Sequence, residues 1–403
     1  MKKNHLITAL LLSFVNVLGF TILIPILPFI VEQYMVPQYF YGLLLSSYAA
    51  FQFLGAPVLG RLSDVYGRRK TLIVSHLGTL LSWGLFAVAY FLPNTNLWWG
   101  TLPILVIGSS RILDGITAGN TSVVSAYISD VTTRKERNKV FGQVGAVTGA
   151  GLIIGPAIGG FTAELGIGYL GTIISASIIS ILALLFIIFR FEETLKHTKN
   201  TIDWGEVLRS LNIVATISKY SHKENVFSML IFRFFFYICM IGYTSIVSLY
   251  VIDLFSFSES QLGFFLFIIG LYLIINQLFL VHRMISHIGQ VKGLVVGSTL
   301  LILGLPILFL ANTPIMFLVL SYPINLGISI IIPTVKTFLS QKTSDKDQGE
   351  ILGLDESLRG LSQAIMPTIG TILYTAVGYT YFGLLSVFLS LGIGFMYLQR
   401  NIT

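Results

Sequence analysis

The feature that most constrains this chain is a series of about twelve long apolar runs separated by short polar stretches. A helix needs roughly 20 mostly apolar residues to cross the hydrocarbon core of a bilayer. Runs near or above this length predict membrane-spanning helices at residues 6–31, 42–60, 71–92, 102–128, 140–162, 168–190, 227–252, 261–281, 293–311, 315–339, 349–376 and 380–398. A soluble helical fold has no need of so many uninterrupted apolar runs.

Composition agrees with this interpretation. The chain of 403 residues is 54% hydrophobic and 11% charged, whereas soluble chains average about 45–50% and about 25%. Lys2 and Lys3 precede the first run as in a signal peptide, but the run continues past Pro25 and Pro28, so we expect an uncleaved span. The single Cys239 excludes an internal disulfide and a thiol cluster for metal, and no cofactor is expected.

The net charge of +7 reflects membrane topology. With twelve crossings and the amino end inside, the loops expected outside contain no Lys or Arg and instead carry Glu32, Glu164, Asp253 and Glu259. This asymmetry is the positive-inside pattern and predicts that both termini are cytoplasmic. The basic excess therefore requires no nucleic-acid partner.

The chain also reads as a duplication. A polar linker at 192–225, with a short surface helix expected near Trp204, separates a six-helix bundle at 1–191 from a second at 226–403. An offset of 211 places Gly142, Pro156, Ile158 and Gly159 on Gly353, Pro367, Ile369 and Gly370. A fainter echo places Gly67 and Lys70 on Gly289 and Lys292. Such repeats commonly enclose a site near the membrane midplane.

Four stretches carry a family resemblance: LGFTILIPILP at 18–28, GRLSDVYGRRK at 60–70, SRILDGITAGN at 110–120 and GLIIGPAIGG at 151–160. They resemble the drug:proton antiporter branch of the major facilitator superfamily, and the first half is most similar to tetracycline-efflux proteins. The resemblance implies an all-α membrane protein of twelve transmembrane helices in two pseudo-symmetric six-helix bundles.

The loop at 60–70 combines bases, glycines and one acid. We expect Gly60 to let a helix end pack closely and Gly67 to allow a tight turn. The bases Arg68, Arg69 and Lys70 hold a loop in the cytoplasm and meet anionic head groups. The resemblance implies that Asp64 faces the start of the eleventh helix near Gly349 and acts in gating, with Asp130 and Arg137 in the same network. A plain topogenic loop would explain the bases but not Asp64.

The expected fifth helix carries the antiporter signature Gly151, Gly155, Pro156, Gly159 and Gly160, preceded by Gly145 and Gly149. Small residues at a spacing of four permit close helix approach, and a proline permits a kink. A packing seam accounts for this pattern physically, and only the resemblance adds a bias toward export.

Ionisable residues inside a membrane are costly and mark functional sites by default. Arg111 and Asp114 lie three residues apart on one face of the fourth span. Asp114 stands where the family motif usually has Gln, about 16 Å into that span at 1.5 Å per residue. We predict that Asp114 couples proton movement to transport, with a static pair to Arg111 as the alternative.

The remaining intramembrane charges are Arg233 in the seventh span and Asp355, Glu356 and Arg359 in the eleventh. Spacing allows Arg359 to pair with either acid, and both acids lie close enough to the cytoplasmic edge for water to reach them. A structural network is the expected role, with proton coupling as the alternative. Arg233 is a candidate for meeting an anionic substrate group or an acid of the fourth helix.

One departure from the tetracycline exporters concerns the proton site. Their acids in the first and third helices correspond to Asn16 and Ser82 here, so tetracycline itself is not assigned as the substrate. Polar and aromatic candidates for the cavity wall, which suit an amphipathic organic molecule, are Asn16, Gln52, Asn120, Arg233, Tyr237, Tyr243, Tyr322 and Asn325.

These observations predict a monomeric inner-membrane secondary transporter that exports a drug-like molecule or metabolite in exchange for protons. Its expected partners are the substrate, protons and membrane lipids. The alternative is proton-driven import of an anionic nutrient or carboxylate siderophore. An enzyme is not expected, because the sequence has no nucleophile constellation, HExxH motif or phosphate loop.

Overall fold

The computed structural model describes residues 3–195, 204–222, 224–343 and 348–398, and these are almost entirely helical. They divide into two compact units. The first comprises residues up to Leu211 together with Phe257–Phe267, and the second comprises Asn212–Ser256 and the residues from Ile268 onward. Each unit is described separately below.

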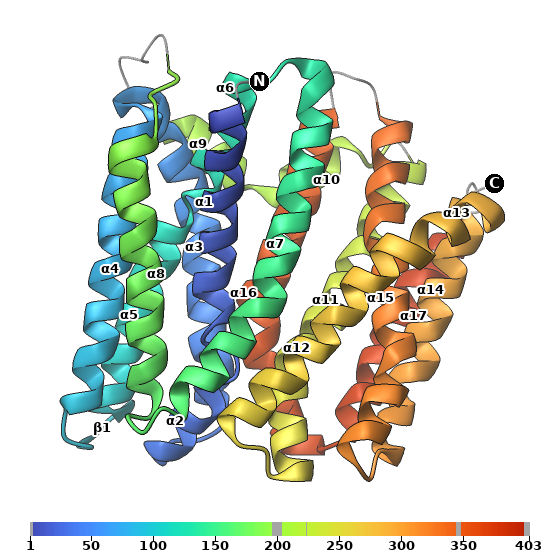
Figure 1. The fold of residues 1–403 in the computed structure, drawn as a ribbon. Coiled ribbons are helices and arrows are strands. Elements are labelled where there is room, and N and C mark those ends of the chain that lie inside the picture. Colours follow the sequence, from blue (N-terminus) through green and yellow to red (C-terminus); the bar gives the residue numbers. More distant parts are fainter. Residues whose placement is uncertain (1–2, 196–203, 223, 344–347, 399–403) are drawn as a thin grey trace. The chain divides into compact units, whose positions relative to one another are not determined.

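The first unit consists of long helices and a few short ones that follow one another along the chain (Figure 1). The helices are α1 (Lys3–Thr21), α2 (Leu27–Gln33), α3 (Tyr39–Tyr66), α4 (Arg68–Phe91), α5 (Leu102–Ala118), α6 (Thr121–Val131), α7 (Arg134–Ala163), α8 (Tyr169–Arg190) and α9 (Trp204–Leu211). A short hairpin of two-residue strands, β1 (Asn96–Leu97) and β2 (Gly100–Thr101), joins α4 to α5. Closely packed pairs are α1 with α7, α3 with α5, and α4 with both α5 and α8.

The second unit contains α10 (Ile213–Lys219), α11 (Glu224–Phe255), α13 (His282–Ile288), α14 (Gln290–Ile307), α15 (Pro314–Lys342), α16 (Gln348–Val377) and α17 (Thr380–Leu398). A π-helical segment, Asn276–Val281, continues α12 (Glu259–Ile275), and a 3₁₀ turn, Leu308–Leu310, ends α14. Here α11 packs against α16 and α17, and α14 packs against α15 and α17.

Nine helices in the described residues are long and apolar enough to cross a membrane. They begin at Tyr39, Arg68, Leu102, Val140, Tyr169, Asn225, Glu259, Gln290 and Pro314, and shorter apolar helices occupy His5–Thr21 and Thr380–Met396. The 30-residue α16 carries Asp355, Glu356 and Arg359, and Arg233 lies on α11. The described helices thus follow the predicted runs, although the count of twelve crossings remains a prediction.

Two predicted spans are interrupted. The run at 6–31 was expected as one helix but breaks between Thr21 and Leu27, ahead of Pro28 at the start of α2. The run at 102–128 ends its first helix at Ala118 and resumes at Thr121. Both breaks lie beside polar side chains described below.

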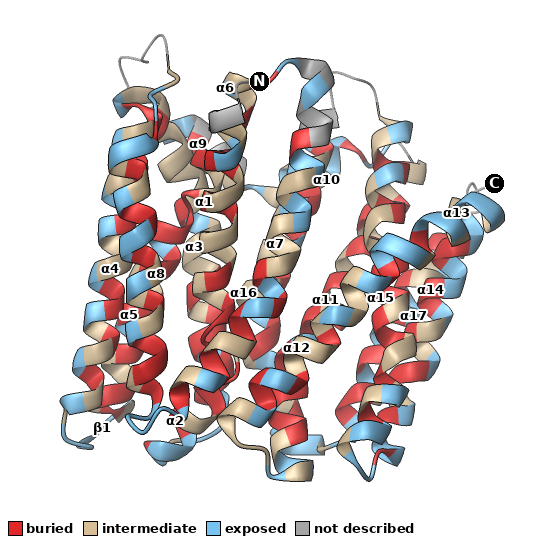
Figure 2. Ribbon diagram, in the orientation of Figure 1, coloured by how far each residue is buried: buried red, intermediate tan, exposed pale blue. Residues whose placement is uncertain are grey.

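The pattern of buried and exposed side chains is the one expected of a protein surrounded by lipid. Large apolar side chains on α4 and α8 face outward, including Val74 at 68% and Phe189 at 76% exposure. Figure 2 shows buried and exposed residues alternating along these helices. Apolar groups gain nothing by avoiding lipid, so an apolar outer surface is stable in a bilayer.

The repeat is visible in local geometry. The helices α7 and α16 are both 30 residues long and contain Pro156 and Pro367 at corresponding places. Gly67, with φ +96° and ψ 152°, lies directly between α3 and α4, and Gly289, with φ 81° and ψ 166°, lies directly between α13 and α14. Positive φ favours glycine, so the same bend is encoded twice.

Candidate functional site

A buried ion pair occupies α5 of the first unit. Arg111 Nη1 donates to Asp114 Oδ2 at 2.8 Å, and the side chains are 1% and 6% exposed. The two residues are three apart, which places them on one helical face as predicted. Among the described acids of this unit, Asp114 is the buried one.

An aromatic ring from α3 completes the pair. The guanidinium carbon of Arg111 lies 4.4 Å from the centroid of the Tyr48 ring, which is close enough for a cation–π interaction. Gly115 permits this approach, because a Cβ there would collide with the backbone carbonyl of Tyr48. The family-like Arg and Gly of the fourth span therefore act together: the glycine brings α3 close enough for its tyrosine to cover the arginine.

Most of the hydrogen-bonding capacity of Arg111 is unused. Its Nε and Nη2 are buried and have no hydrogen-bond partner among the described residues. Guanidinium groups carry five N–H donors, and a buried unsatisfied donor costs about 1–3 kcal/mol. The pair is thus held by one direct hydrogen bond and one ring contact.

Hydroxyl groups join α4 to α5 beside this pair. Ser110 Oγ donates to the Ser82 carbonyl at 2.8 Å, and Ser75 Oγ donates to the Thr117 carbonyl at 2.8 Å. The hydroxyls of Thr79 and Thr117 lie 2.9 Å apart. These contacts fix the polar side of α5 within the unit.

Three predicted cavity residues lie near the break between α5 and α6. Asn16 Nδ2 donates to Asn120 Oδ1 at 2.7 Å, and Asn120 Nδ2 donates to Ser75 Oγ at 2.6 Å. Gln52 Nε2 donates to the Ala118 carbonyl at 3.3 Å. Asn16, for which the resemblance to tetracycline exporters implies an acid, therefore takes part in an amide network instead.

The second unit contains its own buried pair, formed between helices. Arg233 Nε and Nη2 of α11 donate to Asp355 Oδ1 and Oδ2 of α16 at 2.6 and 3.2 Å. Tyr237 donates its hydroxyl toward both carboxylate oxygens at 3.2 Å, and its ring centroid lies 4.5 Å from the guanidinium carbon. Both charged side chains are 0% exposed.

This pair corrects one prediction for Asp355. The acid was expected to be within reach of water, but it is fully buried. Spacing allowed Arg359 to pair with either Asp355 or Glu356, and the structure has Asp355 with Arg233 instead, because α11 and α16 pack directly together. Glu356 instead pairs with Arg359 and Lys336, each at 2.8 Å, and these three side chains are nearly half exposed. Exposed pairs contribute little stability.

The remaining cavity candidates form neutral contacts in the second unit. Asn325 Nδ2 lies 3.5 Å from the Tyr243 hydroxyl and donates to the Ser321 carbonyl at 2.9 Å. Tyr322 donates to Asn276 Oδ1 at 3.1 Å, at the start of the π-helical segment. These candidates all make intramolecular hydrogen bonds in this structure, and their role in a cavity remains a prediction.

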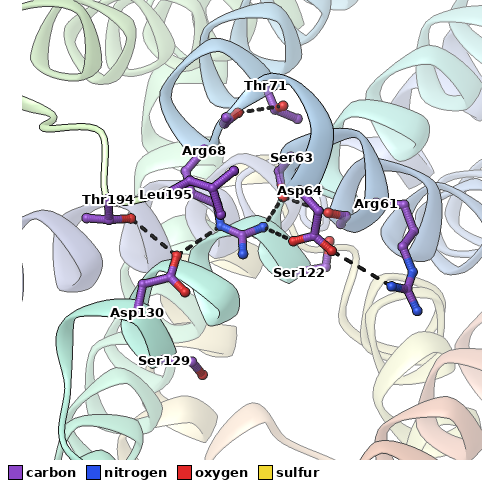
Figure 3. Close-up of polar contacts among 12 residues, drawn as sticks. Arg61, Ser63, Asp64, Arg68, Thr71, Ser122, Ser129, Asp130, Thr194 and Leu195 are labelled. Carbon is purple, nitrogen blue, oxygen red and sulfur yellow. Dashed lines mark hydrogen bonds and ion pairs between the residues drawn. The ribbon is translucent and has the colours of Figure 1, made fainter. Parts of the chain in front are cut away.

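The charged loop is centred on Arg68 (Figure 3). Arg68 Nη1 donates to Asp64 Oδ1 at 2.7 Å and to Ser63 Oγ at 2.5 Å, while Nε donates to Asp130 Oδ2 at 3.1 Å. Asp64 also lies 3.8 Å from Arg61, and Thr194 donates to Asp130 at 3.3 Å. One arginine therefore bridges the end of α3 to the end of α6.

The network shows that two of the three bases at 68–70, Arg68 and Arg69, contact protein groups. Arg68 was expected to face head groups but is 5% exposed and bound to two acids. The guanidinium of Arg69 donates to the Ile188 carbonyl at the end of α8. Lys70 is the exposed base of the three. The side chain of Arg137 lies outside the described residues, and the expected contact of Asp64 near Gly349 stays a prediction.

Gly60 also differs from expectation. It lies inside α3 rather than at its end, because the helix continues to Tyr66. A Cβ at Gly60 would approach Ser122 Oγ of α6 to 3.3 Å. Its small size therefore serves packing within the unit.

Glu193 is a component of this network that sequence reasoning missed. Its Oε1 and Oε2 accept the backbone N–H groups of Arg68 and Arg69 at 3.1 and 3.0 Å, at the first turn of α4. Oε1 also accepts the N–H groups of Thr194 and Leu195, each at 3.0 Å. Burial raises the pKa of the Glu193 carboxyl, but these four donors together outweigh burial and lower it. Two adjacent acids, Glu192 and Glu193, follow the apolar run, and nothing in the sequence shows which of them caps α4.

Glycines of α7 accommodate the break between α1 and α2. A Cβ at Gly151 would approach Val17 to 3.3 Å, and one at Gly155 or Gly159 would collide with Thr21 or Ile22. Thr21 Oγ1 donates across this contact to the Gly151 carbonyl at 3.0 Å. Gly160 faces the start of α12 at Glu259 and Gly263. A Cβ added at Gly145 or Gly149 would meet no atom of the described residues within 4 Å. The close packing expected along these glycines therefore begins only at Gly151.

No cluster of three or more His, Cys, Asp or Glu side chains able to hold a metal occurs in the part of the chain that the structure describes.

Comparison with known proteins identifies the family. The family model described as Major Facilitator Superfamily matches residues 9–282 and 229–402. The chain belongs to the Major Facilitator Superfamily. It is therefore a multi-pass membrane transporter and not an enzyme.

Relatives in this superfamily match nearly the whole chain. A tetracycline resistance protein of class C from Escherichia coli is 28% identical over 95% of this chain and 93% of its own length. A class G protein from Vibrio anguillarum is 30% identical over 93% of this chain and 91% of its own. The crystal structure of the human organic anion transporter MFSD10 (TETRAN) has a TM-score of 0.72 at 20% identity and covers 98% of this chain and 99% of that one. The predicted major facilitator fold is thus confirmed.

Proposed function

We propose that this transporter exports a drug-like molecule or metabolite in exchange for protons, and that Asp114 takes up and releases the proton. The observation that carries this proposal is the buried Arg111–Asp114 pair, joined by a single 2.8 Å hydrogen bond. The export direction rests on the resemblance to tetracycline-efflux proteins and on the similarity to tetracycline resistance proteins.

The negative charge of a buried carboxylate must be neutralised. When Asp114 is ionised, Arg111 neutralises it. When Arg111 turns to another partner, a proton on Asp114 takes over that role. The second state is accessible because only one hydrogen bond joins the two side chains. Moving one charge across 100 mV is worth about 2.3 kcal/mol, which is enough to bias the two states.

The distribution of acids supports this choice. Asn16 and Ser82 stand where related exporters carry acids, and both form neutral hydrogen bonds. Asp355 is also buried, but Arg233 contacts both of its oxygens and the Tyr237 hydroxyl lies within hydrogen-bond distance of both. Asp114 is therefore the buried acid whose partner is most easily exchanged.

The Arg68 network is proposed as part of a gate. Asp64 and Asp130 are tied to one guanidinium, so separating α3 from α6 breaks two ion pairs at once. In this proposal the network forms when the cytoplasmic side is closed. The transporter lies in the inner membrane as a monomer with both termini cytoplasmic, and contacts lipid, substrate and protons.

The test compares Asp114→Asn with Asp253→Asn, a matched change at an acid that accepts a 2.7 Å hydrogen bond from Tyr374. Each purified variant is reconstituted in proteoliposomes, and drug-dependent proton movement is followed across a panel of amphipathic drugs. We expect loss of exchange in Asp114→Asn with intact folding, and retained exchange in Asp253→Asn. Unchanged proton-driven exchange in Asp114→Asn would remove the assignment.

A second candidate function is proton-driven import of an anionic nutrient or carboxylate siderophore. The two unpartnered nitrogens of Arg111 favour it, because they are oriented donors for an acidic group. Arg233 and Arg359 no longer add to this argument, since carboxylates already occupy them. Accumulation in a deletion strain separates the candidates: loss of an exporter raises internal substrate, and loss of an importer lowers it.

A further inference from the structure

Arg111 and Arg233, the buried arginines of the two intramembrane ion pairs, bind their acids through opposite parts of the guanidinium group. In Arg233, the side edge of the guanidinium formed by Nε and Nη2 is filled by both oxygens of Asp355, and Nη1 is left without a partner. In Arg111, Asp114 takes Nη1, and Nε and Nη2 are left without partners. The edge that binds a carboxylate in the second unit is therefore vacant in the first.

That edge has the geometry of a carboxylate receptor. Two parallel N–H groups match the two oxygens of a carboxylate, and such bidentate pairs are the strong, oriented form of an arginine contact. The Arg233–Asp355 pair shows the arrangement at 2.6 and 3.2 Å within this same protein. A buried donor with no partner is costly, so an arginine that serves packing alone would be expected to satisfy this edge internally.

The surroundings hold the vacant edge in place. Tyr48 covers the face of the Arg111 guanidinium, and Asp114 fixes Nη1. The edge is thus supported by side chains from α3 and α5 and does not depend on a loop.

We propose that the Nε and Nη2 edge of Arg111 binds an oxyanion group of the transported substrate, most simply a carboxylate. This inference deepens the proposed function and rests on it for the statement that the ligand is transported. Because both nitrogens are buried in this structure, the edge becomes accessible only when the helices around it rearrange.

Charge balance restricts what the edge accepts. With Asp114 ionised, a simple monoanion would leave the buried site with one excess negative charge, whereas protonation of Asp114 restores neutrality. A zwitterion is neutral by itself, and its basic group replaces the proton at Asp114. Monoanion binding is therefore strengthened by acid, and zwitterion binding is weakened by it. Among the described residues that contact the pair, the other titratable group is Tyr48 of α3, whose ring covers the Arg111 guanidinium. The helix α4 contributes the non-titrating hydroxyls of Ser75 and Thr79 beside the pair.

The experiment uses three probes of one shape: benzoate, neutral benzamide and zwitterionic 4-(aminomethyl)benzoate. Binding to the purified full-length protein is measured by calorimetry at constant ionic strength between about pH 6 and pH 8, where carboxylates are ionised. We expect benzoate to bind at least about tenfold more tightly than benzamide, corresponding to one bidentate contact.

Two arginine-to-lysine variants give the matched comparison. Arg111→Lys keeps the charge but loses the two-pronged edge, and we expect the preference for benzoate to disappear. Arg359→Lys makes the same change at a half-exposed arginine and should leave the preference intact. Asp114→Asn mimics the protonated acid and should bind benzoate more tightly, without dependence on pH.

The outcomes separate this inference from the proposed function. Equal binding of benzoate and benzamide to the unaltered protein would overturn the oxyanion site, and this result does not depend on how the variants fold. It would leave the proposed proton exchange at Asp114 unaffected. An unchanged preference in folded Arg111→Lys would also overturn it. If acid strengthens binding of the zwitterion as well as of benzoate, the oxyanion site stands and exchange of substrate for a proton at Asp114 fails.

Discussion

Arg233 of α11 and Asp355 of α16 form a side-on ion pair, with nitrogen–oxygen distances of 2.6 and 3.2 Å, in a part of the second unit where both side chains are 0% exposed. The pair joins two helices that carry charge in otherwise apolar surroundings. Desolvation makes each partner costly alone.

Removing one partner of this pair should therefore be severe. We expect Arg233→Met or Asp355→Leu alone to lower the free energy of unfolding by about 3–5 kcal/mol, because each leaves an uncompensated buried charge. The double variant should recover most of this loss, since no buried charge remains. Denaturant titration in mixed micelles measures all three, and a double variant as unstable as the singles would contradict the explanation.

Glu193 should stabilise the first turn of α4 in a pH-dependent manner. Glu193→Ala removes the acceptor for two backbone N–H groups of α4, and we expect a loss of about 1 kcal/mol or less at neutral pH, as for a partly exposed helix cap. Glu192→Ala is the neighbouring control, since its 3.8 Å contact with His5 is long and its side chain is 67% exposed.

The sign of the pH dependence follows from the lowered pKa of Glu193. A depressed pKa in the folded state contributes stability that is fully present above the unfolded value near 4.5 and is lost as the pH falls through the folded value. The difference in stability between the unaltered protein and Glu193→Gln should shrink below that pH. A difference that stays constant on acidification would show that the charge has no role.

Arg68 should resist replacement by lysine. The guanidinium reaches Asp64 through Nη1 and Asp130 through Nε, and a single ammonium group cannot reproduce this fork. We expect Arg68→Lys to weaken both stability and transport. The energetic coupling between Asp64 and Asp130, about 0.5–3 kcal/mol for such networks, should vanish in the Arg68→Lys background. Double-mutant cycles measure the coupling.

Arg61→Lys is the control for that series, because Arg61 lies 3.8 Å from Asp64 and a surface pair contributes about 0–1 kcal/mol. Equal losses at Arg61 and Arg68 would indicate a general effect of positive charge and not the bridge.

Two glycines of α7 should respond oppositely to alanine. A Cβ at Gly159 would collide with the Ile22 carbonyl, whereas one at Gly145 meets nothing within 4 Å. We expect Gly159→Ala to cost about 1–3 kcal/mol through overpacking. Gly145→Ala should be neutral or stabilise by up to about 1 kcal/mol, because alanine restricts the unfolded chain. Thermal unfolding midpoints of the two variants provide the measurement, and a similar loss at both would refute the packing explanation.

Much of this architecture follows directly from the sequence. Length and apolarity predict where the helices run, and Gly67 correctly predicts a bend, because positive φ is a local property of the backbone. The spacing of Arg111 and Asp114 predicts their pairing, since residues three apart share a helical face.

Contacts between distant segments were harder to predict. The pairing of Arg233 with Asp355 spans 122 residues and depends on which helices become neighbours. Spacing along one helix allowed Arg359 to pair with Asp355 or with Glu356, but it could not show that Arg233 of another helix is the partner of Asp355. Glu193 escaped notice because its partners are backbone N–H groups, which every sequence contains. The helix break after Thr21 likewise depends on the glycines of a helix far along the chain.

The bend at Gly67 and its counterpart at Gly289 share a backbone shape but not a chemical environment. Around Gly67 the flanking residues are charged, and Asp64 and Arg68 are in direct contact. The corresponding positions beside Gly289 hold Ser286 and Gln290, and Gln290 donates to the neutral side chain of Gln341. The same backbone bend therefore occurs with an ion pair across it and without one. Added salt should weaken the contacts beside Gly67 and leave the corresponding contacts beside Gly289 unchanged.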